Sequence, residues 1–136
     1  MPLGGILETV LYADDIAAAR AFYADVLELE QIGYGADAHV FLRCGDQMLL
    51  IFNPAITRNQ PVPGRLPIPP HGASGAGHVC FRIPGAEFEP WLARLNGLGI
   101  AIEADFEWPN RGRSVYFRDP AGNSVELAEP RIWGLT

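Results

Sequence analysis

The sequence has no lysine, few cysteines and no long hydrophobic run, and each shortage excludes a class of protein. Its ten basic residues are all arginines, spread from Arg20 to Arg131 without a cluster, and the formal net charge is −6 at pH 7. Because a nucleic-acid-binding protein needs a concentrated positive surface, no nucleic acid is expected as a partner.

No apolar run approaches the roughly 20 residues of a membrane-spanning helix, so no membrane partner is expected. The N-terminal residues lack the basic and then apolar pattern of a signal peptide, which predicts a cytoplasmic location. The two cysteines, Cys44 and Cys80, are too few for a disulfide framework and show no Cys-x-x-Cys spacing. They are therefore interpreted as reduced, half-buried thiols without a chemical role.

What the sequence does contain is a pattern of strands and helices that predicts an α+β fold. With 136 residues, of which 49% are hydrophobic, the chain can bury a core. In the first half, Asp14 and Asp15 are N-cap candidates for the helix that follows. Alternating and helical spacings predict a strand at 6–12, a helix at 16–27, a strand near 30–34, and strands at 39–43 and 48–53.

The second half repeats this order. Strands are predicted at 78–83, 100–106, 114–118 and 124–128, with a helix over 88–95 whose first turn accommodates Pro90. The run Asp119-Pro120-Ala121-Gly122-Asn123 is a strong turn signal. The order is thus βαβββ twice, and each copy is too small to close a core alone, so the two sheets are expected to lie side by side or to pack across chains.

The domain organisation follows from this repeat. We expect a single domain over residues 1–136, with one module at 6–53, a second at 77–130 and a linker at 54–76. The linker contains six prolines and three glycines, and neither helix nor strand is expected in it. A structureless segment of this length is usually a linker or a functional loop, and this one could also cover a pocket.

If the helices cover one face of each sheet, the other face carries an unusual polar set. The residues expected under the helices of the second module are large and apolar: Val79, Phe81, Val115, Phe117, Val125 and Leu127. Side chains at the alternate strand positions point to the opposite sheet faces, and among them Glu8 of the first module and His78 and Glu126 of the second are the unusual polar residues. A glutamate among apolar strand neighbours is costly to bury unless it is paired, protonated or bound to a metal.

Two interpretations of this set remain open from the residues alone. Two carboxylates and a neutral imidazole give a divalent cation a site of about zero net charge, with coordination positions left for a substrate. Alternatively, Glu8 and Glu126 form salt bridges with Arg82 or Arg118, which lie on the same parity, and His78 is an ordinary structural histidine.

Several segments resemble one known family over most of the chain. Besides the repeated βαβββ order, they are Ala-Arg-Ala-Phe-Tyr at 19–23, Gly-His-Val-Cys-Phe at 77–81 and Asp-Pro-Ala-Gly-Asn-Ser-Val-Glu-Leu at 119–127. Together they resemble the vicinal oxygen chelate (VOC) superfamily, which includes glyoxalase I, extradiol dioxygenases, fosfomycin-resistance transferases and bleomycin-binding proteins. The resemblance implies a cupped mixed sheet built from two βαβββ modules, with the helices on the outer face.

In that family, the metal ligands come from the first and last strands of each module. The resemblance therefore implies Glu8, His78 and Glu126 as ligands of a divalent ion (Mn, Mg, Ni or Zn), with Glu8 and Glu126 also able to act in catalysis. The fourth corner falls on Leu50, which cannot bind a metal. A glutamate in the first strand, where the family's enzymes commonly have histidine, disfavours iron oxygenation and favours a lyase or isomerase acting on a small oxygenated metabolite.

The remaining site predictions concern the substrate. Tyr116 and Arg118 are placed to orient it, and Phe52 with His71 from the linker is placed to contact it. Trp108 is expected either in an apolar wall or simply in the core. The alternative to an enzyme is a metal-free protein of the bleomycin-resistance type that sequesters a small ligand through aromatic residues. A homodimer is expected in either case.

Overall fold

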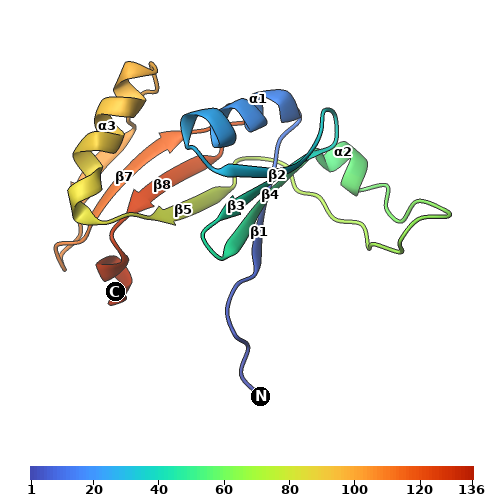
Figure 1. Ribbon diagram of the computed structural model, residues 1–136, viewed down its shortest axis with the longest axis horizontal. Helices are drawn as coiled ribbons and strands as arrows, with labels where there is room; N and C mark the ends of the chain where they lie inside the picture. The colour runs from blue at the N-terminus through green and yellow to red at the C-terminus, as the bar shows by residue number, and fades with distance from the viewer. The chain divides into compact units, whose positions relative to one another are not determined.

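The computed structural model describes all 136 residues, Met1–Thr136, as two compact units, Met1–Gly75 and Ala76–Thr136 (Figure 1). No helix in it has the length and apolar character needed to cross a membrane. Each unit contains a four-stranded mixed sheet and helices, so the predicted α+β fold with two βαβββ modules is confirmed.

The first unit follows the predicted order with one addition. Its elements are β1 (Glu8–Tyr12), α1 (Ile16–Arg20), the π-helical turn η1 (Ala21–Val26), β2 (Glu30–Gly35), β3 (His39–Cys44), β4 (Gln47–Phe52) and α2 (Pro54–Thr57). The strand order is β1-β4-β3-β2, with β1 parallel to β4 and the other neighbours antiparallel. The strand expected near residues 30–34 is therefore confirmed as β2.

Three details of the first unit differ from the sequence-based expectation. The helix expected over 16–27 is α-helical only to Arg20, because its last part bonds in the wider pattern in which the Leu27 amide donates to the Phe22 carbonyl. The first strand begins at Glu8 instead of residue 6. The proline-rich segment does contain a helix, α2, because the Asn53 side chain caps its N-terminus and Pro54 fits the first turn.

The core of the first unit lies between its helices and one face of its sheet. The buried sheet residues are Leu11, Val40, Leu42, Leu49 and Ile51. Facing them are Ile16, Ala19, Phe22 and Tyr23 from α1 and η1, which are also buried. Asp15 starts α1 by accepting a hydrogen bond from the Ala18 amide, as its N-cap prediction required. The opposite sheet face, which carries Glu8 and Tyr12, is left outside this core.

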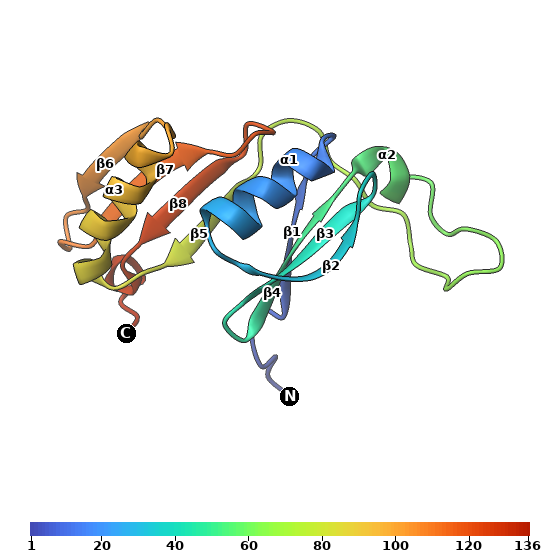
Figure 2. The same cartoon turned by 45° about the horizontal axis from the view of Figure 1, so that its top comes forward.

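The second unit repeats the arrangement (Figure 2). Its elements are β5 (His78–Arg82), the 3₁₀ turn η2 (Gly85–Glu87), α3 (Phe88–Gly97), β6 (Ala104–Glu107), β7 (Arg113–Arg118), β8 (Ser124–Ala128) and the 3₁₀ turn η3 (Pro130–Trp133). The strand order is β5-β8-β7-β6, with β5 parallel to β8. The strand expected over 100–106 is shorter and shifted, since β6 begins at Ala104.

The predicted face of the second sheet does form its core. Val115, Phe117, Val125 and Leu127 are buried together with Phe88 and Leu95 of α3, while Val79 and Phe81 on β5 are half-buried. The opposite parity of the same strands carries His78, Tyr116 and Glu126. Alternation along these strands therefore separates a packed face from a polar one.

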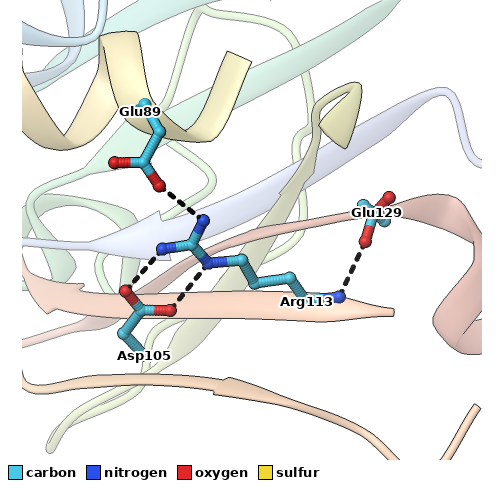
Figure 3. A network of polar contacts seen from close by, with 4 residues as sticks. All are labelled: Glu89, Asp105, Arg113 and Glu129. Atoms are coloured by element: carbon cyan, nitrogen blue, oxygen red, sulfur yellow. Dashed lines mark hydrogen bonds and ion pairs between the residues drawn. The ribbon is translucent and has the colours of Figure 1, made fainter. Parts of the chain in front are cut away.

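Arg113 ties α3 to the edge of the second sheet (Figure 3). Its guanidinium donates to both carboxylate oxygens of Asp105 on β6, at 2.8 and 2.7 Å, and to Glu89 on α3 at 2.8 Å. It also lies over the Phe88 ring, 5.0 Å from its centroid. The backbone amide of Arg113 donates to the Glu129 carboxylate at 2.9 Å. One side chain thus joins a helix and two strands.

We predict that Arg113→Met lowers the free energy of unfolding by about 1–3 kcal/mol, because it leaves two carboxylates without their shared donor. Urea denaturation measures the change. Arg43→Met is the matched control, since Arg43 pairs with Glu30 at 3.3 Å on an exposed surface and its loss should cost less than about 0.5 kcal/mol. Equal effects of the two substitutions would contradict the structural role of Arg113.

A second prediction concerns acid. The hydrogen bonds from Arg113 lower the pKa of Asp105 below its usual value. A lowered pKa in the folded state means that Asp105 stabilises the fold above about pH 4 and that this stabilisation is lost as the pH falls further. The difference in unfolding free energy between the wild type and Asp105→Asn should therefore shrink between about pH 6 and pH 3. A difference that stays constant over this range would contradict the prediction.

Candidate functional site

The parallel pairing of β5 and β8 brings His78 and Glu126 together on the polar face of the second sheet. The register sets His78 opposite Ser124 and Cys80 opposite Glu126, so His78 and Glu126 are diagonal neighbours. His78 Nε2 lies 3.3 Å from Glu126 Oε2. The His78 side chain is 51% exposed, whereas that of Glu126 is only 6% exposed. The Glu126 carboxylate is thus buried, and the His78 imidazole beside it is exposed to solvent.

The turn between β7 and β8 fixes the start of β5, and with it His78. The Asp119 carboxylate accepts hydrogen bonds from the amides of Ala121 and Asn123, at 2.9 and 2.8 Å. The Asn123 side-chain oxygen then accepts from the Gly77 amide at 2.7 Å. Asp119 and Asn123 are both buried. This turn therefore fixes the position of Gly77 and of His78, which follows it.

The imidazole of His78 is oriented by the backbone. His78 Nδ1 lies 3.0 Å from the carbonyl oxygen of Ser124, which can only accept a hydrogen bond. Nδ1 therefore carries the proton, and in the neutral ring Nε2 is an acceptor directed at Glu126. A histidine fixed in this way by a carbonyl is the usual arrangement of a metal ligand.

The other oxygen of Glu126 is held by a serine, and no arginine pairs with this carboxylate. The Ser114 hydroxyl donates to Glu126 Oε1 at 2.6 Å. Arg118 instead forms two hydrogen bonds with Glu103, at 2.6 and 2.9 Å, and Arg82 donates to the carbonyl of Thr136. The alternative in which an arginine neutralises Glu126 is therefore wrong.

Two further side chains next to Glu126 are held in their neutral forms. Burial raises the pKa of Tyr116 to about 12, with a further contribution from the Glu126 carboxylate. Cys80 is exposed, so the expectation of half-buried thiols is wrong for it and is confirmed only for Cys44. Desolvation of the Cys80 sulfur, reinforced by the Glu126 carboxylate, nevertheless raises the pKa of this thiol to about 12. Both groups thus keep their protons at neutral pH, so Tyr116 remains a hydrogen-bond donor and Cys80 remains an unreactive thiol.

The geometry of the pair fits a shared divalent cation. Two ligands that lie about 2.1 Å from one ion, at angles between octahedral and tetrahedral, are about 3.0–3.4 Å apart. The observed separation of 3.3 Å falls in this range. Neither unit by itself contains three or more His, Cys, Asp or Glu side chains grouped to hold an ion. His78 and Glu126 therefore supply two ligands, and others would have to complete the shell.

Glu8, the third predicted ligand, belongs to the first unit. It is the first residue of β1 and is exposed. No hydrogen bond or ion pair of its carboxylate is present in the structure. Glu8 is therefore not a buried mid-strand glutamate, because β1 begins at this residue, whereas Glu126 is buried in the middle of β8.

The two units can be compared position by position through their sheets. In the first unit, β1 pairs with β4 in the register Glu8 to Met48 and Val10 to Leu50. The corresponding pairs in the second unit are His78 to Ser124 and Cys80 to Glu126. Glu8 thus occupies the position equivalent to His78, and Leu50 occupies the position equivalent to Glu126.

The first unit carries a cluster of rings on the face that holds Glu8. The Tyr12 hydroxyl lies 2.7 Å from His71 Nδ1, and the Phe52 ring meets the His71 ring edge to face at 5.1 Å. Phe41 packs against Phe52, and His39 stacks on Phe41 at 4.3 Å. The backbone amide of His71 donates to the carbonyl of Thr57, so the segment after α2 is bonded to the end of that helix, and the Tyr12 contact holds His71 against β1. The predicted contact residues Phe52 and His71 therefore lie together.

The second unit has its own aromatic row beside His78. Tyr116 lies between His78 and Phe106, with nearly parallel rings, and Phe106 meets Trp108 at 5.0 Å. The Trp108 indole nitrogen donates to Ser114 Oγ at 2.8 Å. The sequence pattern predicts Trp108 in an apolar wall or the core and does not indicate this hydrogen bond. Residues two apart in an extended segment point to the same side, so the spacing of Phe106 and Trp108 does indicate that their rings lie on one face.

Comparison with known proteins places this arrangement in a family. Residues 5–127 match the Glyoxalase/Bleomycin resistance protein/Dioxygenase superfamily. The crystal structure of a lactoylglutathione lyase from Agrobacterium tumefaciens is 47% identical, with 99% of this chain and 100% of that chain covered and a TM-score of 0.92.

More distant structures share the fold. A glyoxalase/dioxygenase from Nostoc punctiforme is 23% identical over 92% of this chain and 90% of its own, with a TM-score of 0.67. A virulence protein from Salmonella typhimurium is 23% identical over 95% and 98%, with a TM-score of 0.69. With a match over 5–127 and a full-length relative at 47% identity, the chain belongs to the glyoxalase/bleomycin resistance protein/dioxygenase superfamily.

Proposed function

We propose that the protein is a divalent-metal-dependent lyase or isomerase whose substrate is a small oxygenated metabolite that chelates the metal. His78 and Glu126 are the proposed ligands from the second unit, and Glu8 is the proposed ligand from the first. The observation that carries this proposal is the approach of His78 Nε2 to Glu126 Oε2 at 3.3 Å while Nδ1 is committed to a carbonyl.

Two facing acceptors need a cation between or beside them. A carboxylate oxygen and the unprotonated nitrogen of a neutral imidazole repel each other, and the repulsion is strong because Glu126 is buried. A proton or a divalent metal ion removes it. Carboxylate and imidazole ligands suit Mn, Mg, Ni or Zn, and the nitrogen ligand favours the transition metals in this group.

The chain's own residues suggest how the roles divide. The bound ion would supply Lewis-acid polarisation of two neighbouring substrate oxygens. Of the two glutamates proposed for catalysis, Glu8 is better suited to leave the ion and act as a general base because it is exposed, whereas Ser114 holds Glu126 in place. Tyr116, which keeps its proton, is better suited to orient a substrate oxygen than Arg118, whose guanidinium is bound to Glu103.

The comparisons support the lyase class. The relative that is 47% identical along its full length is named a lactoylglutathione lyase. Phe52 and His71 of the first unit are proposed to contact the apolar part of the substrate, because they lie on the same sheet face as Glu8 and form part of a cluster of rings.

A metal-free binding protein is the second candidate, and one observation favours it. Leu50 occupies the position equivalent to Glu126, so the first unit offers no carboxylate there. In that case, rings such as Phe41, Phe52, Tyr116 and Trp108 would bind a small aromatic or cationic ligand. Such a protein would bind its ligand equally well after treatment with a chelator.

We predict that His78→Ala lowers the affinity for Zn²⁺ or Ni²⁺ by more than the roughly 10–100-fold typical of losing an outer-shell partner, because it removes a direct ligand. Isothermal titration measures the affinity, and elemental analysis measures the metal retained when no metal is added during purification. His39→Ala is the matched control, because it removes another imidazole, one that stacks on Phe41 and is not a proposed ligand. It should bind metal like the wild type.

Equal, near-zero metal content in the wild type and His78→Ala, with no measurable affinity in either, would overturn the proposal and favour the metal-free binding protein.

We also propose a homodimer, because each sheet ends in edge strands whose backbone groups need a partner or cover. The residues of the first unit that remain exposed include large apolar side chains, among them Ile6, Leu7, Leu66 and Ile68. Light scattering coupled to size-exclusion chromatography should give about twice the chain mass of 14.8 kDa. A stable species at the chain mass itself, independent of concentration, would contradict this.

A further inference from the structure

A line of hydrogen bonds runs from the edge of the second sheet to the buried carboxylate of Glu126. The Trp108 indole N–H donates to Ser114 Oγ at 2.8 Å, and the Ser114 hydroxyl donates to Glu126 Oε1 at 2.6 Å. Ser114 is fully buried and Glu126 is 5% exposed, whereas Trp108 is 39% exposed. The line therefore joins an accessible ring to a carboxylate that water scarcely reaches.

The chemistry of the three groups fixes the direction of both bonds. An indole nitrogen can only donate, so Ser114 Oγ must be the acceptor from Trp108. A serine hydroxyl has a single hydrogen, and the short contact with a carboxylate oxygen is where that hydrogen lies. Trp108 thus orients the hydroxyl, and the hydroxyl orients Oε1. The second oxygen, Oε2, is consequently the one directed at His78.

The position of the indole is itself constrained by the turn between β6 and β7. The Trp108 amide donates to the Gly112 carbonyl, and the Arg111 amide donates to the Trp108 carbonyl, both at 2.8 Å. The Asn110 side chain donates to the carbonyls of Arg131 and Ile132. A turn bonded within itself and to the following 3₁₀ segment leaves Trp108 little freedom to move away from Ser114.

We propose that Trp108 and Ser114 are positioning residues that hold the Glu126 carboxylate in the orientation in which Oε2 and His78 Nε2 can share a divalent cation. This inference rests on the proposed metal-dependent function. Neither residue touches the ion; Ser114 acts on Glu126 directly, and Trp108 acts only through Ser114. A ligand carboxylate whose second oxygen is held by a hydrogen bond loses less freedom when the metal binds.

The decisive test is a double-mutant cycle read out as Zn²⁺ affinity by isothermal titration. Ser114→Ala should weaken binding about 10–100-fold, and Trp108→Phe, which keeps an aromatic ring but removes the N–H, should weaken it by a smaller factor. The double variant should bind no more weakly than Ser114→Ala alone, because Trp108 acts only through the serine. Ser114→Thr, which keeps the hydroxyl, should recover most of the affinity.

Two controls separate positioning from general damage. Trp133→Phe removes an indole that is 79% exposed and should leave the Zn²⁺ affinity unchanged. Thermal melts identify any variant that fails to fold, and in that case the comparison of Trp108→Phe with Trp133→Phe decides alone. If Trp108→Phe and Trp133→Phe both bind Zn²⁺ like the wild type, the positioning role is overturned. It is also overturned if the double variant loses the sum of the binding free energies lost by Ser114→Ala and Trp108→Phe.

The Zn²⁺ affinities of the variants distinguish the positioning role from the metal-dependent function. If the wild type binds Zn²⁺ and His78→Ala does not, while Trp108→Phe and Ser114→Ala are unaffected, only the positioning role is overturned. If the wild type binds no Zn²⁺, the metal-dependent function and the positioning role are overturned together.

Discussion

A buried carboxylate is the constraint on which the second unit depends. Removing a charged carboxylate from water costs several kcal/mol, roughly, unless hydrogen bonds and a positive partner replace the lost hydration. For Glu126 a hydroxyl from β7 supplies a hydrogen bond, and the positive charge would come from the cation that Glu126 is proposed to share with the imidazole at the start of β5. The turn at Asp119 and Asn123 then secures the strand that carries the imidazole.

The two units share one topology and one register but differ in what their polar faces carry. The second unit has a carboxylate and an imidazole in contact, whereas the first has Leu50 and an exposed Glu8 at the equivalent positions. The first unit instead gathers rings around the hydrogen bond between Tyr12 and His71. In the proposed enzyme, one repeat therefore provides most of the metal chemistry, and the other provides a base and contacts for the substrate.

Much of this fold can be predicted from the sequence, because strands with one buried face show strict alternation. Val125 and Leu127 alternate with Glu126 along β8, and the bounds of that strand were predicted without error. The turn that begins at Asp119 was equally clear, since only a few residue types suit its geometry. Parity also placed His78 and Glu126 on the same face, although it could not give the distance between them.

The features that were missed depend on contacts that a linear pattern does not contain. The change from α to π geometry after Arg20 leaves the spacing of apolar residues almost intact, so periodicity does not detect it. The short helix α2 is set by one cap and one proline within a segment dominated by prolines. The hydrogen bond from Trp108 to Ser114 depends on the register between β6 and β7, which follows from tertiary packing.

The central claim is that the Ser124 carbonyl holds the proton of His78 on Nδ1, which directs Nε2 toward a cation shared with Glu126. Long-range proton–nitrogen NMR of the ¹⁵N-labelled protein, recorded without metal and after addition of Zn²⁺, tests it most directly. We predict that Nδ1 of His78 remains protonated and that the Nε2 resonance moves to a metal-bound position when Zn²⁺ is added. A proton on Nε2 in the Zn²⁺-treated protein, or a His78 spectrum that Zn²⁺ leaves unchanged, would contradict it.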